Sequence, residues 1–288
     1  MSLTSLLIIL ASAGIHVVAH VALKLARDRT AFVWWELLWG GVLYLPVLVF
    51  NWQSIPGAAW AIMGASAVFE AFYFLAIARA YQFGDLSIIY PLARGTAPLC
   101  LLLWSVLFLG ETATLGGVAG IALIVLGLYV SHLPRLGAWA EPLRALRQAG
   151  PRWALLGGVA ISAYTALDRA GIRHVDPLLY TYLALWLTLA LMTPFSLKGR
   201  GWRGLMAELR ASRWSSVLAG FTTLAAYALV LYAMRAGTPA SYAGAVREVS
   251  VVLGAAIGVI FLKESAGPMR LAGAACVALG VAVIAVLG

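Results

Sequence analysis

Charged residues are scarce in this chain of 288 residues. They make up 11% of the sequence, and Asp and Glu together number only 11. A soluble globular domain carries about 25% charged residues, so this composition excludes a soluble globular protein. Hydrophobic residues instead make up 63% of the chain, and the mean hydropathy is +0.94. The composition predicts a polytopic membrane protein, in which helices satisfy their own backbone hydrogen bonds within the lipid.

Cysteine and histidine are also rare, with 2 Cys and 4 His. Cys100 and Cys276 fall in apolar stretches, which predicts buried small side chains and no structural disulfide. His16 and His20 have the i, i+4 spacing of a zinc-binding pair, but no Glu follows His16 and no acidic or cysteine cluster lies nearby. No metal site and no cofactor are therefore expected. The chain also lacks a Gly-x-Ser-x-Gly motif and aspartates at catalytic spacing, so no catalytic residue is assigned and an enzyme is not expected.

Apolar runs long enough to cross about 30 Å of hydrocarbon as helices fill most of the sequence. Ten spans are expected, at residues 3–25, 31–50, 57–80, 86–109, 114–132, 153–172, 177–196, 214–236, 239–262 and 267–287. Segments rich in Gly, Pro and charge separate them. The N-terminus lacks a basic region and a small-residue cleavage site, so the first run is expected to be retained as a span. The predicted fold is an all-α membrane protein with ten transmembrane helices.

The two halves of the chain repeat the same features. An offset of 153 residues places Arg94 on Arg247, Phe108–Glu111 on Phe261–Glu264, Gly120 on Gly273, and Gly127 on Gly280. Five spans per half is an odd number, so the second half must enter the membrane from the opposite side. The prediction is two inverted five-helix repeats, an organisation common in secondary transporters. The expected units are a first repeat at residues 1–133, a basic connecting loop at 134–151, and a second repeat at 152–288.

Lysines and arginines gather on one side of this predicted topology. Fifteen lie on that side: Lys24, Arg27, Arg29, Arg79, Arg135, Arg144, Arg147, Arg152, Lys198, Arg200, Arg203, Arg210, Arg213, Lys263 and Arg270. Three lie on the other: Arg169, Arg173 and Arg235. The positive-inside rule predicts an inner-membrane protein with the basic side in the cytoplasm and both termini outside. Topology and contact with membrane lipids account for the net charge of +9, and no nucleic-acid partner is expected.

Polar residues within the predicted spans are the candidate substrate-binding residues, because an ionisable group in lipid is costly unless it faces a cavity or a partner. They are His16, His20, Glu70, Tyr73, Arg94, Tyr164, Asp168, Tyr227, Arg247 and Glu248. Glu70 is a candidate for proton coupling or for binding a cation; the alternative is a permanent ion pair with Arg94 or Arg247. The two arginines could bind a carboxylate or phosphate, or simply join the two halves. The histidines and tyrosines could line the cavity or serve in helix packing.

The sequence resembles the EamA-type members of the drug/metabolite transporter superfamily. In each five-span unit the fourth span ends in Phe-Leu-Gly-Glu or Phe-Leu-Lys-Glu, and a span with Gly-x6-Gly follows. The resemblance covers nearly the whole chain. It implies a central cavity between the first, third, fourth, sixth, eighth and ninth spans, with the glycine-rich fifth and tenth spans as scaffold. It also implies transport of amino acids, other metabolites or drugs, although many members look to have cytoplasmic termini.

These observations predict a secondary active transporter, expected to export a small polar metabolite by alternating access. A cavity that mixes Glu, Asp, Arg and His suits a zwitterion such as an amino acid. In this hypothesis Glu70 exchanges protons, the candidate coupling ion, while Arg94 and Arg247 bind a carboxylate. The alternatives are a lipid flippase or accessory membrane subunit, and multidrug cation efflux. A monomer is expected, since ten spans around one cavity need no partner chain.

Overall fold

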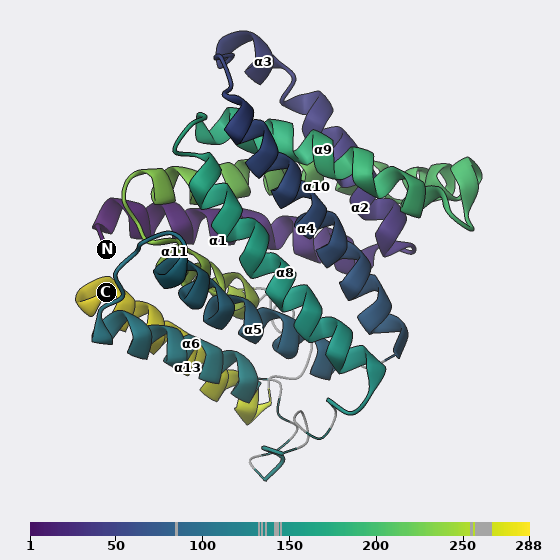
Figure 1. Cartoon of the computed structure of the whole chain (residues 1–288). Coiled ribbons are helices and arrows are strands. Elements are labelled where there is room, and N and C mark those ends of the chain that lie inside the picture. The colour runs from purple at the N-terminus through teal and green to yellow at the C-terminus, as the bar shows by residue number, and fades with distance from the viewer. Residues whose placement is uncertain are drawn as a thin grey trace.

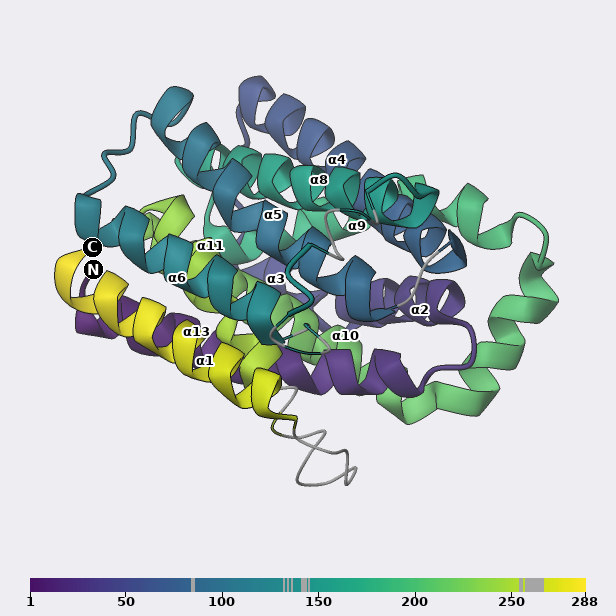
Figure 2. The ribbon, with the colours of Figure 1, turned by 90° about the horizontal axis from the view of Figure 1, so that it is seen from below.

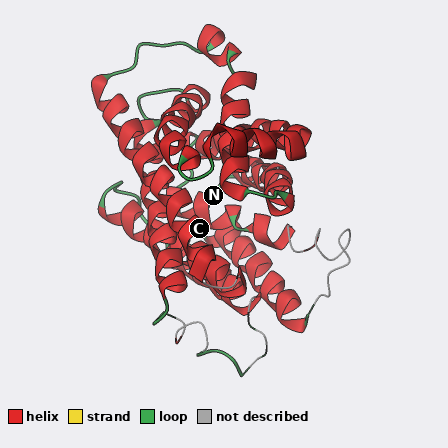
Figure 3. Ribbon diagram, turned by 90° about the vertical axis from the view of Figure 1, so that its right-hand side faces the viewer, coloured by secondary structure: helices red, strands yellow, loops and turns green. Residues whose placement is uncertain are grey.

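All of the regular secondary structure in the described part of the chain is α-helix. The computed structural model describes residues 1–83, 86–131, 133, 135, 137–140, 144, 146–253, 256 and 267–288. Within these ranges helices are joined by loops and no strand occurs (Figure 3). Six segments have the length and apolarity to cross a membrane: Leu3–Leu23, Arg29–Phe50, Gly57–Ala80, Pro177–Leu197, Gly201–Arg235 and Pro268–Leu287. The prediction of an all-α, multi-pass membrane protein is confirmed.

Most helices begin and end close to the predicted limits (Figure 1). They are α1 (Leu3–Leu25), α2 (Arg29–Leu43), α3 (Pro46–Phe50), α4 (Gly57–Phe83), α5 (Leu86–Leu107), α6 (Leu115–Ser131), α8 (Ala149–Gly171), α9 (Pro177–Leu197), α10 (Gly201–Arg235), α11 (Ala240–Arg247) and α13 (Pro268–Leu287). The predicted second span is divided into α2 and α3 just before Pro46, which has no N–H to donate to a continuing helix. The glycines and prolines between apolar runs were therefore good indicators of helix ends.

The helix α10 begins earlier than the sequence predicted. The expected span starts at residue 214, but α10 starts at Gly201 and contains a non-helical residue, Ser212, with φ −133° and ψ 30°. The residues before Ser212 read as a loop because they are rich in charge. They form a helix because one of its faces is packed: Leu205 and Glu208 are buried, and the Trp35 indole donates a hydrogen bond to the Leu205 carbonyl at 2.8 Å.

The ninth predicted span is interrupted in the middle. It was expected as one helix over residues 239–262, but α11 ends at Arg247. A turn follows at Glu248, whose N–H donates to the Ala245 carbonyl at 3.0 Å, and helical residues resume over 249–253. The repeated exit signal at residues 261–264 lies outside the described residues. The turn places the charged residues 247 and 248 at a break in the helix, where side chains leave in different directions.

Three pairs of helices from different halves of the chain make the most extensive contacts. α1 packs on α10, α4 packs on α8, and α6 packs on α13, as Figures 1 and 2 both show. The first two pairs enclose α5 and α11, and α2 and α9 cover one side. The largest buried side chains gather between these layers and include Tyr180, Tyr182, Tyr242 and Phe32. The candidate polar residues lie inside this arrangement.

Glycines allow the backbones of α6 and α13 to approach closely. A Cβ atom at Gly280 would lie 2.7 Å from the Gly120 carbonyl oxygen and 2.9 Å from the Ile124 nitrogen. Gly127 and Gly273 face each other in the same way. In lipid, where apolar side chains gain little by leaving their surroundings, such small-residue contacts contribute much of helix association. The two glycine-rich spans, expected to serve as scaffold, therefore pack closely on each other.

The substitution Gly280→Ala should destabilise the protein. The added methyl group meets backbone atoms that cannot rotate away, so α6 and α13 must separate, at a cost of about 1–3 kcal/mol. The measurement is the melting temperature in detergent, with Gly64→Ala as the control because a Cβ there meets no atom within 4 Å. Equal melting temperatures for the two variants would contradict this account of the interface.

Candidate functional site

Arg247 is the centre of a partly buried polar cluster at the end of α11. Its guanidinium lies over the ring of Tyr227 from α10, with 5.1 Å between the Arg247 Cζ and the ring centroid. One terminal nitrogen lies 3.5 Å from His16 Nε2 of α1. The Arg247 Nε atom is buried and has no hydrogen-bond partner among the described residues. Arg247 therefore has hydrogen-bonding capacity that the described residues around it do not use.

The two histidines of α1 extend this cluster. The rings of His16 and His20 meet edge to face, with 4.3 Å between their centroids. The Nδ1 atom of His16 and the Nε2 atom of His20 are buried without a partner in the described part of the chain. Buried nitrogens of this kind usually find a partner, since an unpaired polar group costs about 1–3 kcal/mol. Together with Arg247, the pair presents three unused polar atoms in one region.

A row of tyrosines leads to Arg247. The ring centroids of Tyr73 (α4) and Tyr164 (α8) are 6.3 Å apart, and those of Tyr164 and Tyr227 are 6.2 Å apart. Tilted and edge-to-face contacts at these distances are the preferred arrangements of aromatic rings. The three candidate tyrosines thus form one continuous surface across three helices, which ends at the guanidinium of Arg247.

Asp168 connects four helices through hydroxyl groups. Its carboxylate accepts hydrogen bonds from Ser66 of α4, Tyr227 of α10 and Tyr180 of α9, the last at 2.8 Å. The side chain is 1% exposed, and no cation pairs with it among the described residues. Three donors stabilise the charged form of a buried carboxylate without an ion pair. Asp168 therefore positions the hydroxyl of Tyr227, whose ring faces Arg247.

Glu70 lies on α4 and accepts a hydrogen bond from Thr188 of α9 at 2.6 Å. In the described residues it forms no ion pair with either Arg94 or Arg247. Glu36 of α2 likewise accepts a hydrogen bond from a threonine, Thr223, and is buried at 8% exposure. The sequence reasoning missed Glu36, although it stands in an apolar run, which is the criterion that selected Glu70. In the described part of the chain, each of these two acids therefore has a threonine hydroxyl group as its hydrogen-bond partner.

Arg94 has a different role in this structure from that of its repeat counterpart. Its Nε lies 3.1 Å from Glu248 Oε2, and a terminal nitrogen donates to the Ser250 hydroxyl at 3.3 Å. Both charged side chains are buried, at 9% and 4% exposure. The pair joins α5 to the turn after α11. The adjacent residues 247 and 248 thus point to different partners. Among the described residues, Arg94 pairs with a carboxylate and Arg247 does not.

A polar pocket of about 290 Å³ lies at the end of the molecule where both termini are found. Its lining includes Thr112 and Thr114 from the loop before α6, and Thr238 and Pro239 from the loop before α11. Nearby, the Glu111 carboxylate pairs with Arg169 at 3.0 Å and accepts the N–H of Ala240 at 2.8 Å. Since α11 has 8 residues at about 1.5 Å each, Arg247 lies ~12 Å deeper than this pocket.

The structure therefore gathers most of the predicted site residues but separates them into two groups. The first group surrounds Arg247 and consists of His16, His20, Tyr73, Tyr164, Tyr227 and Asp168. The second is the ion pair of Arg94 with Glu248. No group of three or more His, Cys, Asp or Glu that could hold a metal ion occurs in the part of the chain that is described.

Comparison with known proteins identifies the family to which the sequence belongs. The sequence matches the EamA-like transporter family over residues 2–133 and 148–286. The chain belongs to this family. It is therefore a transporter of the drug/metabolite type, as the resemblance in its motifs implied. The EamA match covers both halves, and the residues between the two matched segments are those of the basic connection.

Solved structures show the same fold. A crystal structure described only as that of a protein aligns with a TM-score of 0.72, over 98% of this chain and 96% of its own, at 19% identity. At such low identity the likeness shows the EamA fold alone and says nothing of the substrate. No curated protein matches the sequence. The solute must therefore be inferred from the site.

Proposed function

We propose that this EamA-family protein exports a small polar metabolite that carries a carboxylate, with an amino acid or a similar zwitterion as the best fit. One observation carries this proposal: Arg247 Nε, His16 Nδ1 and His20 Nε2 are buried together without partners among the described residues. An anionic group bound there would satisfy them, and a planar guanidinium suits a carboxylate. The nearby acids Glu70 and Asp168 provide the opposite charge for an ammonium group.

The packing of the helices supports an alternating-access mechanism. In the proposed scheme of ten spans, α1 and α8 are the first spans of two inverted repeats, and α4 and α10 are the third spans. α1 packs on α10 just as α8 packs on α4, and the two fifth spans, α6 and α13, pack on each other. This exchange of partners is what a two-fold relation between the halves requires. Two such halves can exchange conformations and open a central site to either side.

The pocket beside the termini is the proposed entrance from the outer side. It lies at the beginning of α11, and the tyrosine row and Arg247 lie deeper in the same helix bundle. In the proposed orientation both termini are outside and the basic loops are in the cytoplasm. The Glu111–Arg169 ion pair would then join the two halves at the outer end, and it would have to break when that end opens.

A thermal-stability screen tests the proposed function. The purified protein, in one fixed mixture of detergent and lipid, is heated with amino acids, organic anions, polyamines and cationic drugs. A ligand that binds only the folded state raises the melting temperature, and the increase grows with the logarithm of the ligand concentration above its Kd. We expect zwitterions or carboxylates to do so. If only lipophilic cations raise it, multidrug efflux replaces metabolite export as the function, and if no solute does, a flippase or accessory role does.

Glu70→Gln should separate binding from coupling. The amide keeps the size of the side chain and its contact with Thr188 but cannot exchange a proton. We therefore expect the variant to bind the ligand and to exchange it across proteoliposomes, but to lose accumulation driven by a pH gradient. Thr188→Val is the control, because it removes only the hydrogen-bond donor. Proton-driven accumulation at the native level in Glu70→Gln would exclude Glu70 as the coupling residue.

A further inference from the structure

The first part of α10 lies outside the spanning part of that helix. α10 contains 35 residues, which at about 1.5 Å per residue exceeds the ~30 Å of hydrocarbon. The non-helical backbone at Ser212 divides it, and the residues from Ser212 to Arg235 are enough to cross the membrane. Figure 2 shows the earlier part at the right-hand edge, turned away from the axis of the rest of α10. Residues 201–211 therefore form a short helical segment beyond the length that is needed to cross a membrane, and it is called the surface helix below.

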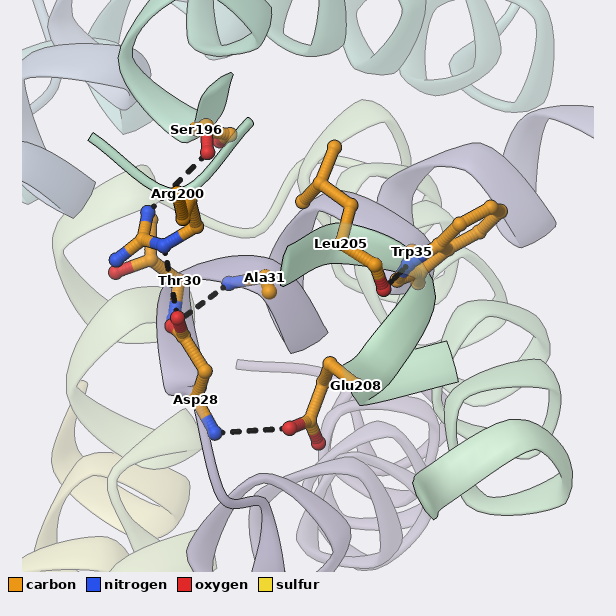
Figure 4. Close-up of polar contacts among 8 residues, drawn as sticks. All are labelled: Asp28, Thr30, Ala31, Trp35, Ser196, Arg200, Leu205 and Glu208. Carbon is orange, nitrogen blue, oxygen red and sulfur yellow. Dashed lines mark hydrogen bonds and ion pairs between the residues drawn. The ribbon is translucent and has the colours of Figure 1, made fainter. Parts of the chain in front are cut away.

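The inner face of this surface helix is fixed to the bundle by polar contacts (Figure 4). Glu208 accepts the backbone N–H of Asp28, between α1 and α2, at 2.9 Å. Arg200, just before the helix, pairs with the Asp28 carboxylate at 2.8 Å, while Trp35 bonds to the Leu205 carbonyl. All of these contacts are made with Asp28 and Trp35, on one side of the surface helix. They therefore fix the rotation of the helix and leave its opposite side facing outward.

The outward face is basic and aromatic. Arg203, Arg210 and Arg213 are exposed, and Trp214 beside Arg213 is 75% exposed. Trp202 is 56% exposed, but its ring contacts Trp34 and Trp35 of α2 on the inner side. The Arg213 guanidinium lies over the Trp214 ring at 5.2 Å. Glu208 is the single acid between residues 198 and 214, and it faces inward with 4% exposure. No carboxylate within this segment therefore competes for the three arginines.

We propose that Arg203, Arg210 and Arg213 form a binding site for the phosphate headgroups of anionic phospholipids in the adjoining leaflet. Exposed tryptophans favour the headgroup level of a membrane, so they place the helix at the depth of the phosphates. Arginine binds phosphate with two parallel hydrogen bonds, and basic side chains at a membrane surface attract anionic lipids. The occupant is a lipid because the three exposed arginines lie next to the exposed Trp214, at the end of a helix long enough to span the membrane.

The test compares lipid selectivity in two triple variants. Native protein, Arg203→Gln/Arg210→Gln/Arg213→Gln and the control Arg135→Gln/Arg144→Gln/Arg147→Gln are reconstituted in phosphatidylcholine vesicles. The control removes the same charge from exposed residues of another basic connection. Electron paramagnetic resonance gives the association of spin-labelled phosphatidylglycerol relative to phosphatidylcholine. We expect several-fold selectivity in the native protein and the control, and its loss in the α10 variant; lysine in place of the three arginines should retain much of it.

Three outcomes would overturn the lipid site. Equal loss of selectivity in both triple variants would mean that general surface charge, and not this face, attracts the lipid. Unchanged selectivity in the α10 variant would exclude the three arginines. Displacement of the labelled lipid by inorganic phosphate, at an ionic strength where chloride has no effect, would identify a free-anion site instead. None of these measurements requires a transported solute, so they are independent of the proposed transport function.

Discussion

Replacing Arg94 by Met should strongly lower the stability of the folded protein. The substitution leaves Glu248 buried, at 4% exposure, without the ion pair it makes with Arg94 at 3.1 Å. Removing one partner of a buried pair costs about 3–5 kcal/mol, because the remaining charge is uncompensated. The measurement is the free energy of unfolding in mild detergent by chemical denaturation. A change below about 1 kcal/mol would show that the pair is not a structural link between α5 and the turn after α11.

The double variant Arg94→Met/Glu248→Met provides the control. Apolar side chains of similar size can replace a buried ion pair with little loss or even a gain of stability. We expect the double variant to recover most of the stability that Arg94→Met loses, which gives a large coupling energy in a double-mutant cycle. It should also respond to the same ligands as the native protein, since this pair belongs to the structural group. Loss of the ligand response in a stable double variant would place Arg94 in the binding site.

Replacing Arg247 by Ala should abolish ligand binding with little effect on folding. Arg247 forms no ion pair among the described residues, so its removal leaves no buried carboxylate uncompensated. A bound carboxylate would lose two charge-assisted hydrogen bonds of about 1.5–3 kcal/mol each, which weakens binding by roughly a hundredfold or more. The measurement is the affinity, by calorimetry or by thermal shift, for the ligand that the solute screen identifies.

Two further variants distinguish a direct role of Arg247 in ligand binding from a general loss of folded structure. Arg247→Lys keeps the charge but loses the planar pair of donors, so its affinity should fall between those of the native protein and Arg247→Ala. Tyr227→Phe keeps the ring beneath the guanidinium and removes only the hydroxyl that donates to Asp168. It should retain binding better than Arg247→Ala does. Native affinity in Arg247→Ala would remove this residue from the proposed site.

Much of the architecture can be read from the sequence because lipid restricts what a chain can do. An apolar run of about 20 residues must become a helix, since its backbone has no other hydrogen-bond partners there. For this reason α1, α5, α9 and α13 lie where they were expected. The glycines of the fifth and tenth spans indicated a scaffold role, because small residues admit the backbone of another helix, but the structure showed that α6 and α13 pack on each other.

Two other features were not predicted, because residues of the same type can occur both in loops and in packed helices. The charged residues before Ser212 were taken for a loop, yet a helix forms there once Leu205 and Glu208 have a surface to pack against. Glu36 was overlooked, although its hydrogen bond from Thr223 resembles that of Glu70 from Thr188. The local sequence is a weak predictor for a short amphipathic segment or a single acid. Whether the segment forms a helix, and which group the acid binds, depends on contacts with distant helices.

The sequence by itself determined that this is a helical membrane protein of the EamA family and that two arginines occupy matching places in its halves. Only the tertiary structure decided that Arg94 is neutralised by Glu248 while Arg247 remains beside His16 and Tyr227. The physical reason is that a charge within the membrane is defined by its nearest partners, and these come from other helices. Helical periodicity fixes which face a side chain occupies, but the rotation and neighbours of each helix follow from the packing of the whole bundle.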